Sequence, residues 1–289
     1  MKRRLAAAGL ALALAAGAAP ARAEPPVWIV RDADSEMVLF GSVHVLPPGL
    51  VWRSPALEAA LGRADDLWFE LPMGPQAEQE VARLAGSLGA LAPTQSLFKL
   101  LPPKDAQRLI KVADAYGVDK VALDRMQPWL AEVALAGAAY RQAGADVDHG
   151  VEDTVNAAAP LTTPRRALET PAEQLGLFAS MPLKDQIASL RETLGELAKD
   201  PHAYMKLVRA WQAGDVKRLD REALQPLRKA SPEEFRRLVT ERNVRWVQAL
   251  DARLRGHGRT VVVVGVGHLV GSDGLPARLR ALGYSVTGP

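Results

Sequence analysis

Two histidines of this chain follow a glycine in the same local frame, one near each end of the sequence. The frames are Gly41-Ser42-Val43-His44 and Gly265-Val266-Gly267-His268, and each comes directly after an apolar run. A glycine that ends a strand lets the backbone turn sharply, so a side chain three residues later can lie over the end of that strand. The repeated Gly-x-x-His pattern therefore predicts one site built from both ends of the chain, with Gly41 and Gly265 as its turns.

A glutamate is the natural third member of this set. Glu70 ends the apolar run Leu67-Trp68-Phe69, where an unpaired carboxylate would be costly to bury. Two imidazoles and one carboxylate can hold a divalent ion when water takes the fourth position. His44, Glu70 and His268 are therefore a candidate metal site. By spacing alone, a metal site and three ordinary polar residues at strand ends explain the pattern equally well.

Other familiar motifs are missing or out of register. A dinucleotide-binding loop that began at Gly265 would need a glycine at position 270, where this chain has Val270. The sequence contains no Gly-x-Ser-x-Gly elbow of a serine hydrolase and no His-Glu-x-x-His of a zinc protease. His149 follows two aspartates in a segment that could bind a metal, although its composition favours a solvated loop before a helix.

Four further polar residues adjoin apolar segments and extend the candidate site. Arg242 falls on the apolar side of a long expected helix and should be buried, with Asn243 beside it. Such an arginine could stabilise a developing oxyanion or orient Glu70. Glu169 and Gln174 flank a helix start, where capping and surface roles are the simpler interpretation and contacts to the site or a substrate are the alternative.

The elements expected around these residues place strands at both ends of the chain. Residues 27–30 and 37–40 are short apolar runs around a cluster of turn formers, which predicts a hairpin. Ser54 and Pro55 begin a helix that ends near Gly62, and residues 66–71 form the next strand. Near the other end we expect a fully buried strand over 259–264, a helix that starts at Pro276 and a short strand over 284–286.

The middle of the chain, from about residue 76 to 256, is expected to be mainly helical. Residues 166–169 could form a short strand, and Thr170-Pro171-Ala172-Glu173 behind it has the pattern of a capping box. Ser231-Pro232-Glu233-Glu234 repeats that pattern and predicts a long helix that ends near Gly256. The expected fold is α/β with α+β character, a central mixed sheet from the N- and C-terminal strands carrying a large helical insertion.

The first 23 residues have the pattern of a secretory signal peptide. Lys2, Arg3 and Arg4 precede an Ala/Leu-rich stretch that ends at Ala21-Arg22-Ala23. We therefore expect an exported protein, periplasmic or extracellular, with one domain over residues 24–289 and no transmembrane segment in the mature chain. Removing four of the 36 basic residues leaves 32 against 33 acidic ones, a net charge of about −1. This balance gives no support for a nucleic-acid partner.

The chain has no cysteine. Disulfides, thiolate metal ligands and a cysteine nucleophile are therefore excluded. Any metal site must use histidine, glutamate or aspartate, and the fold must rest on its apolar core.

Several short blocks, in this order along the chain, resemble the TraB/GumN family, which is related to the Tiki metalloproteases. The blocks span essentially the whole mature chain, and the ordered set is far more specific than either Gly-x-x-His frame alone. They are Leu39-Phe40-Gly41-Ser42-Val43-His44-Val45-Leu46, Trp68-Phe69-Glu70-Leu71, Leu168-Glu169-Thr170 with Glu173-Gln174-Leu175, Glu241-Arg242-Asn243, and Val264-Gly265-Val266-Gly267-His268-Leu269-Val270-Gly271 followed by Gly274-Leu275.

This resemblance implies a metal-dependent peptidase site. The functional histidines and glutamate of Tiki carry over to His44, His268 and Glu70, and the arginine and asparagine to Arg242 and Asn243. The leading hypothesis is a hydrolase in which Mn, Co or Zn activates a water against the carbonyl of a peptide or small-molecule substrate.

Two alternatives follow from the wider superfamily, in which erythromycin esterases use an equivalent histidine without metal and another relative binds haem. One is a metal-free esterase with His44 as general base and Glu70 setting its tautomer and charge. The other is a non-enzymatic envelope protein that binds haem, a glycan or a partner in the same cleft.

Overall fold

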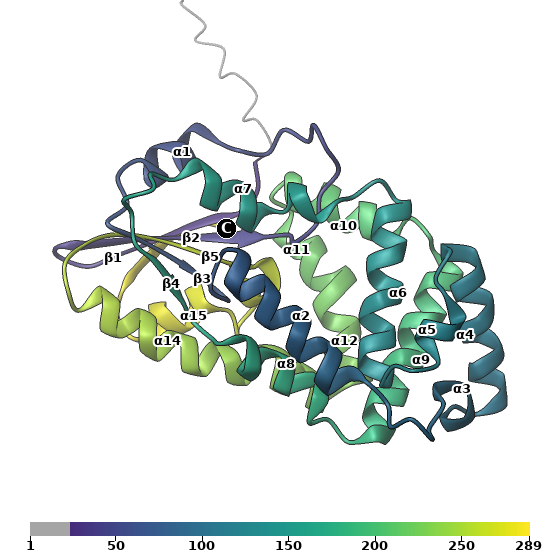
Figure 1. Cartoon of the computed structure of the whole chain (residues 1–289). Coiled ribbons are helices and arrows are strands. Elements are labelled where there is room, and N and C mark those ends of the chain that lie inside the picture. The colour runs from purple at the N-terminus through teal and green to yellow at the C-terminus, as the bar shows by residue number, and fades with distance from the viewer. Residues whose placement is uncertain (1–23) are drawn as a thin grey trace, which may run out of the picture.

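A six-stranded mixed sheet brings the two ends of the chain together (Figure 1). The structure is a computed structural model that describes residues 24–289, so the expected signal peptide lies outside the described residues. The strands are β1 (Val27–Arg31), β2 (Ser35–Ser42), β3 (Asp66–Phe69), β4 (Arg165–Ala167), β5 (Gly258–Gly265) and β6 (Ser285–Thr287). They are arranged in the order β4-β3-β5-β2-β1-β6.

The strands β2, β5, β3 and β4 run parallel to one another, and β1 and β6 add an antiparallel edge. β1 and β2 pair as the expected hairpin, with Val30 opposite Met37. Ser42 at the end of β2 lies opposite Gly265 at the end of β5, so the two Gly-x-x-His frames leave the sheet side by side. The α/β fold with a central mixed sheet is confirmed.

Helices fill most of the chain between β3 and β5. The α-helices are α1 (Pro55–Leu61), α2 (Pro75–Gly89), α3 (Leu97–Leu100), α4 (Pro103–Tyr116), α5 (Lys120–Leu123), α6 (Pro128–Gln142), α7 (Val151–Ala158), α8 (Pro171–Ala179), α9 (Leu183–Lys199), α10 (Ala203–Gln212), α11 (Val216–Leu219), α12 (Gln225–Ala230), α13 (Pro232–Phe235), α14 (Glu241–Leu254) and α15 (Leu275–Ala281). Short 3-10 turns, η1 (Val147–His149) and η4 (Val266–His268), and π-helical turns, η2 (Asp220–Leu224) and η3 (Arg236–Thr240), complete the order. No helix of residues 24–289 is long and apolar enough to cross a membrane.

Of the three helix starts expected to have a capping side chain, two are confirmed by their hydrogen bonds. The Ser54 hydroxyl accepts from the Leu57 N–H, and Thr170 and Glu173 form a complete capping box at the start of α8. Ser231 makes no such side-chain bond. The uniform helix expected from there to Gly256 is also wrong, because the π-helical turn η3 interrupts it before α14. Such turns are common next to functional sites, and this one directly precedes α14, whose second residue is Arg242.

Each face of the sheet buries its own apolar core. Phe40, Phe69 and Trp211 pack on the face that α1, α7 and α10 cover, whereas Trp246 and Leu279 of α14 and α15 cover the other face. A third core lies among α4, α6 and α9, away from the sheet (Figure 1). Helices therefore cover both faces of the sheet, and the carboxyl ends of its parallel strands are left uncovered by them. The helical part of the molecule lies beside these strand ends.

Candidate functional site

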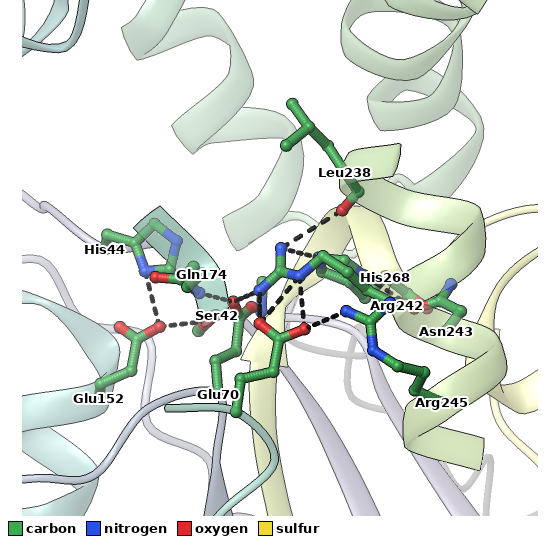
Figure 2. A network of polar contacts seen from close by, with 12 residues as sticks. Ser42, His44, Glu70, Glu152, Gln174, Leu238, Arg242, Asn243, Arg245 and His268 are labelled. Atoms are coloured by element: carbon green, nitrogen blue, oxygen red, sulfur yellow. Dashed lines mark hydrogen bonds and ion pairs between the residues drawn. The ribbon is translucent and has the colours of Figure 1, made fainter. Parts of the chain in front are cut away.

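The expected site residues lie at the carboxyl ends of four neighbouring parallel strands. His44 follows β2 by two residues, Glu70 follows β3 directly, Glu169 follows β4 by two residues and His268 follows β5 by three. Parallel strands end at one edge of a sheet, which is where open α/β sheets bind their ligands. Figure 2 shows the side chains of His44, Glu70 and His268, which come from separate elements, gathered in one region.

Glu70 is buried, and both of its carboxylate oxygens accept hydrogen bonds. Its Oε1 accepts from the Gly265 N–H at 2.7 Å, and its Oε2 accepts from Arg242 Nη2 at 2.7 Å and Gln174 Nε2 at 3.1 Å. Burial alone would raise the pKa of this carboxyl. Attraction to His268, which is protonated only at acid pH, to the Arg242 guanidinium and to His44, together with the Gly265 N–H, outweighs burial and lowers the pKa to about 2. Glu70 is therefore a fixed negative charge.

Arg242 is the buried centre of the network. Its Nε and Nη2 donate to Glu169 at 2.8 to 3.1 Å, and Nη2 also donates to Glu70. Nη1 donates to the Leu238 carbonyl at 3.3 Å and contacts His268 Nε2 at 3.0 Å. A guanidinium has five N–H groups, and these contacts engage each of its nitrogens. Arg242 thus orients Glu70 and has no N–H directed at an oxyanion.

Glu169 lies deeper in the network than its capping sequence suggests. Its carboxylate is 2% exposed and pairs with both Arg242 and the more exposed Arg245. Gln174 also points inward and donates to Glu70. The simpler interpretation of Glu169 and Gln174 as capping and surface residues is therefore wrong. Glu169 balances the buried charge of Arg242, and Gln174 helps to orient the carboxylate of Glu70.

His268 is buried and held in one tautomer. Arg242 Nη1 can only donate, so Nε2 of His268 accepts and Nδ1 carries the proton. That proton is donated to Asn243 Oδ1 at 2.7 Å, while Asn243 Nδ2 donates to the His268 and Asp273 carbonyls. Burial, helped by the Arg242 charge, lowers the pKa of His268 to about 3 despite the opposing effect of Glu70. The ring is neutral at physiological pH.

His44 has a different environment, because its side chain is 69% exposed and faces a cleft. Its Nδ1 lies 2.8 Å from Glu152 Oε1, and the same oxygen accepts from the Ser42 hydroxyl at 2.6 Å. The charge and hydrogen bond of Glu152 raise the pKa of His44 to about 9, and the charge of Glu70 adds to the increase. Below that pH both ring nitrogens carry a proton. When the ring loses one, Glu152 keeps the other on Nδ1 and leaves Nε2 free for a ligand or a proton.

The sequence did not single out Glu152, which lies 108 residues from His44 in the first turn of α7. The Val151 N–H donates to the Val43 carbonyl at 3.2 Å, so α7 begins against the His44 loop. A Cβ at Gly150 would collide with the His44 carbonyl oxygen, so this close approach needs glycine. In the sequence, an acidic residue shortly after such a glycine could have indicated a partner for His44. The same pattern is common at helix starts, where an acidic side chain compensates the helix dipole.

The space above Gly265 is where His44, Glu70 and His268 meet. A Cβ added to Gly265 would lie 3.1 Å from Glu70 Oε1, 3.7 Å from His268 Cδ2 and 3.9 Å from His44 Nε2. Two of these atoms are polar and free to face a small ligand, whereas His268 presents a ring carbon. Gly41 has a packing role, since a Cβ there would press on Val266 at 2.8 Å.

The predicted ligand set of His44, Glu70 and His268 does not fit a metal ion in this arrangement. Both ring nitrogens of His268 are committed, Nε2 to Arg242 and Nδ1 to Asn243. Across residues 24–289, no three His, Asp or Glu side chains converge as a metal-binding group. The site as built offers two donors, His44 Nε2 and Glu70 Oε1.

The cleft in front of these residues has a volume of about 760 Å³ and lies between the strand ends, α2 and α7. Met73, Ala77 and Val81 supply an apolar wall. Besides Glu70 and Glu152, the lining includes three acidic residues and no lysine or arginine. Those three are Glu78, Asp148 and Asp153.

The sequence model of the TraB/PrgY/gumN family matches residues 26–288. The chain belongs to the TraB/PrgY/gumN family. The match includes all four strand ends that carry the site, from β2 to β5, together with α7 and α14. No curated protein and no solved structure matches the chain significantly.

The site of this TraB/PrgY/gumN protein has two distinct halves. The buried half joins Glu70, Glu169, Arg242 and His268 in a fixed charge network. The exposed half is the His44–Glu152 pair at the cleft. In the exposed half, His44 is a titrating side chain that lines the cleft.

Proposed function

We propose that this TraB/PrgY/gumN protein is a hydrolase in which His44, paired with Glu152, is the general base that activates water. The observation that carries the proposal is the 2.8 Å contact between His44 Nδ1 and Glu152 Oε1, which directs Nε2 into the cleft. A histidine oriented by a carboxylate is the usual arrangement for activating an oxygen nucleophile. Among the sequence alternatives, this favours the metal-free esterase, with Glu152 in the role expected of Glu70.

In the proposed reaction, His44 moves one proton from the attacking water to the leaving group. His44 Nε2 takes a proton from a water above Gly265, and the resulting hydroxide oxygen bonds to the carbonyl carbon of the substrate. The tetrahedral intermediate then expels the alcohol or amine, which leaves with the proton that His44 returns. Glu152 stays ionised and stabilises the imidazolium formed between these steps.

Glu70 supports this chemistry through its charge and position. Its Oε1 faces the same space above Gly265 as His44 Nε2, so a water there can donate one hydrogen to each. Arg242 and Glu169 hold Glu70 in place and keep it ionised. We therefore assign Glu70 to orienting the water and Arg242 to positioning Glu70.

The cleft favours neutral or cationic substrates. Its acidic lining, with Glu78, Asp148 and Asp153 around the site, repels phosphate and carboxylate groups. Its apolar wall along α2 can bury the acyl or alcohol part of a substrate. Esters and amides with an apolar or basic group beside the carbonyl meet both conditions, and such amides include peptides.

A metal-activated peptidase remains the second proposal, because His44 Nε2 and Glu70 Oε1 face one point and are both metal-ligand types. His268 would have to leave Arg242 before its Nε2 could join them. If Mn, Co or Zn bound there, it would supply Lewis-acid activation of water. The two proposals differ in whether a chelator abolishes hydrolysis.

One screen tests both proposals together. Purified protein is assayed on a library of neutral and basic esters and peptides, with and without a chelator and with added Mn, Co or Zn. We expect chelator-resistant hydrolysis that His44→Ala lowers by about 10²- to 10⁴-fold. Hydrolysis that needs the metal would favour the peptidase, and hydrolysis unchanged in His44→Ala would overturn both. No turnover of any substrate would favour a binding protein.

A further inference from the structure

Within residues 24–289, the cleft is lined by only two side chains that carry an N–H group, His44 and Gln174. In the proposed reaction, His44 handles the proton of the attacking water. The main-chain N–H of Gly265 already donates to Glu70, and the N–H groups of Arg242 are engaged inside the buried network. Gln174 is therefore the side chain that can meet negative charge as it develops on a substrate oxygen.

Gln174 is held at a fixed place beside Glu70. It lies in the first half of α8, whose start is fixed by the capping box of Thr170 and Glu173. The residue before that capping box is Glu169, which is buried against Arg242. A donor whose position is set before the reaction stabilises developing charge without a cost of reorganisation. The chain around Gln174 meets that condition.

The Gln174 amide has a free N–H and lines the cleft. Because the Glu70 carboxylate is ionised and can only accept, the amide nitrogen faces it, and Nε2 donates to Oε2 at 3.1 Å (Figure 2). An amide nitrogen carries two hydrogens, and the second one meets no acceptor among residues 24–289. The other oxygen of the same carboxylate, Oε1, borders the space above Gly265. The amide and the site of the attacking water therefore lie beside the two oxygens of one carboxylate.

We propose that Gln174 is the oxyanion donor of this site, a role that rests on the function proposed above. Its free N–H binds the carbonyl oxygen of the substrate. As the water oxygen bonds to the carbonyl carbon, one electron pair of the C=O bond moves to that oxygen, which accepts from Nε2. His44 then holds the proton of the water, so an imidazolium balances the oxyanion. When the intermediate collapses, the electron pair returns to the C=O bond and the leaving group departs with the proton from His44.

This role narrows the substrate to a compound with a carbonyl group. A single neutral N–H matches one oxygen that gains its charge only during the reaction. A phosphoryl group already carries negative charge on several oxygens and is usually bound by cationic side chains or metal ions. The cleft lining has several carboxylates and, in the part of the chain that the structure describes, no lysine or arginine. Carboxylic esters and amides therefore fit this cleft, and phosphate esters do not.

A pair of substrates that differ in the carbonyl atom tests this role. The pair is the best ester from the screen and its thionoester, in which sulfur, a weak hydrogen-bond acceptor, replaces the carbonyl oxygen. We expect Gln174→Met to lower kcat for the ester by about 10²- to 10³-fold with little change in KM, because the N–H acts in the transition state. The same variant should lower kcat for the thionoester by less than about tenfold. Methionine keeps the length of the side chain and removes the amide.

Gln79→Met is the matched control. Gln79 is an exposed glutamine of α2 that does not line the cleft, so this variant should hydrolyse both substrates at the wild-type rate. A trifluoromethyl ketone analogue of the ester, whose hydrate resembles the tetrahedral intermediate, should inhibit Gln174→Met about 10²-fold less strongly than the wild type. Thermal unfolding of each variant establishes that it is folded.

Two results would overturn the role of Gln174 and leave the proposed hydrolase in place. One is an unchanged ester rate in Gln174→Met. The other is an equal loss for ester and thionoester, which would show that Gln174 acts only by orienting Glu70 and its water. Ester hydrolysis that is absent in the wild type or unchanged in His44→Ala would instead overturn the proposed function, and the role of Gln174 with it.

Discussion

Glu152 Oε1 lies 2.8 Å from His44 Nδ1 and joins the first turn of α7 to the loop after β2. The contact gives an exposed histidine a fixed tautomer and a raised pKa. Ser42 donates to the same oxygen and holds the carboxylate in place. His44 is therefore an oriented side chain that can gain and lose a proton, whereas the other Gly-x-x-His histidine, His268, is neutral and accepts a hydrogen bond from Arg242.

Filling the space above Gly265 should stop catalysis and leave the fold intact. We predict that Gly265→Ala lowers kcat/KM by about 100-fold or more, because the methyl group takes the place of the attacking water. The backbone at Gly265 has φ −47°, which alanine adopts without strain, so the melting temperature should change little. Gly176→Ala, where an added Cβ meets no atom within 4 Å, is the control and should retain full activity. Equal activity in both variants would contradict the assignment of this space to water.

Breaking the buried charge network should cost far more stability than breaking a surface pair. We predict that Glu169→Gln lowers the free energy of unfolding by about 3 kcal/mol, because Arg242 loses one of its two carboxylate partners in a buried setting. Glu80→Gln removes one partner of the exposed Glu80–Arg83 pair and should have no measurable effect. Denaturant unfolding of the two variants checks the contrast, and similar losses in both would show that the network is not stabilising.

His268 should make the protein acid-labile. Its folded-state pKa is lowered to about 3, so between pH 6.5 and 3 the unfolded chain takes up a proton that the folded protein excludes. The contribution of His268 to stability is therefore complete above about pH 6.5 and falls as the pH drops below it. Above pH 5, Glu70 contributes little to this slope, since its carboxyl is mostly ionised in the unfolded chain as well as in the folded protein. Melting temperatures between pH 7 and 5 should fall more steeply for the wild type than for His268→Gln, and equal slopes would refute this origin.

Much of the framework could be predicted from the sequence, because local patterns determine it. Valine-rich β5 and the turn formers of the β1–β2 hairpin each specify their own element. The two Gly-x-x-His frames and Glu70 follow strands, so a sheet with parallel strands had to bring them to one edge. The capping box at Thr170 is equally local and is confirmed.

The division of roles within the site could not be predicted, because it depends on pairings across long stretches of chain. Glu152 reaches His44 only because Gly150 lets α7 start against the loop after β2. Glu169 looked like part of a helix start, and only the packing of α14 brings Arg242 to it. Both ring nitrogens of His268 are engaged only because Arg242 and Asn243 approach the ring from another element.

The most direct test of whether His44 and Glu152 are the catalytic pair compares the pH dependence of kcat/KM in the wild type and Glu152→Gln. The substrate is the best ester from the screen, and a chelator is present. We predict that wild-type activity rises with pH as His44 loses its proton, with a midpoint near pH 9. Glu152→Gln keeps the acceptor for His44 and removes its charge, so the midpoint should move toward about 6.5 and the plateau rate should fall. An unchanged midpoint and plateau in Glu152→Gln would contradict the assignment of His44 and Glu152 as the catalytic pair.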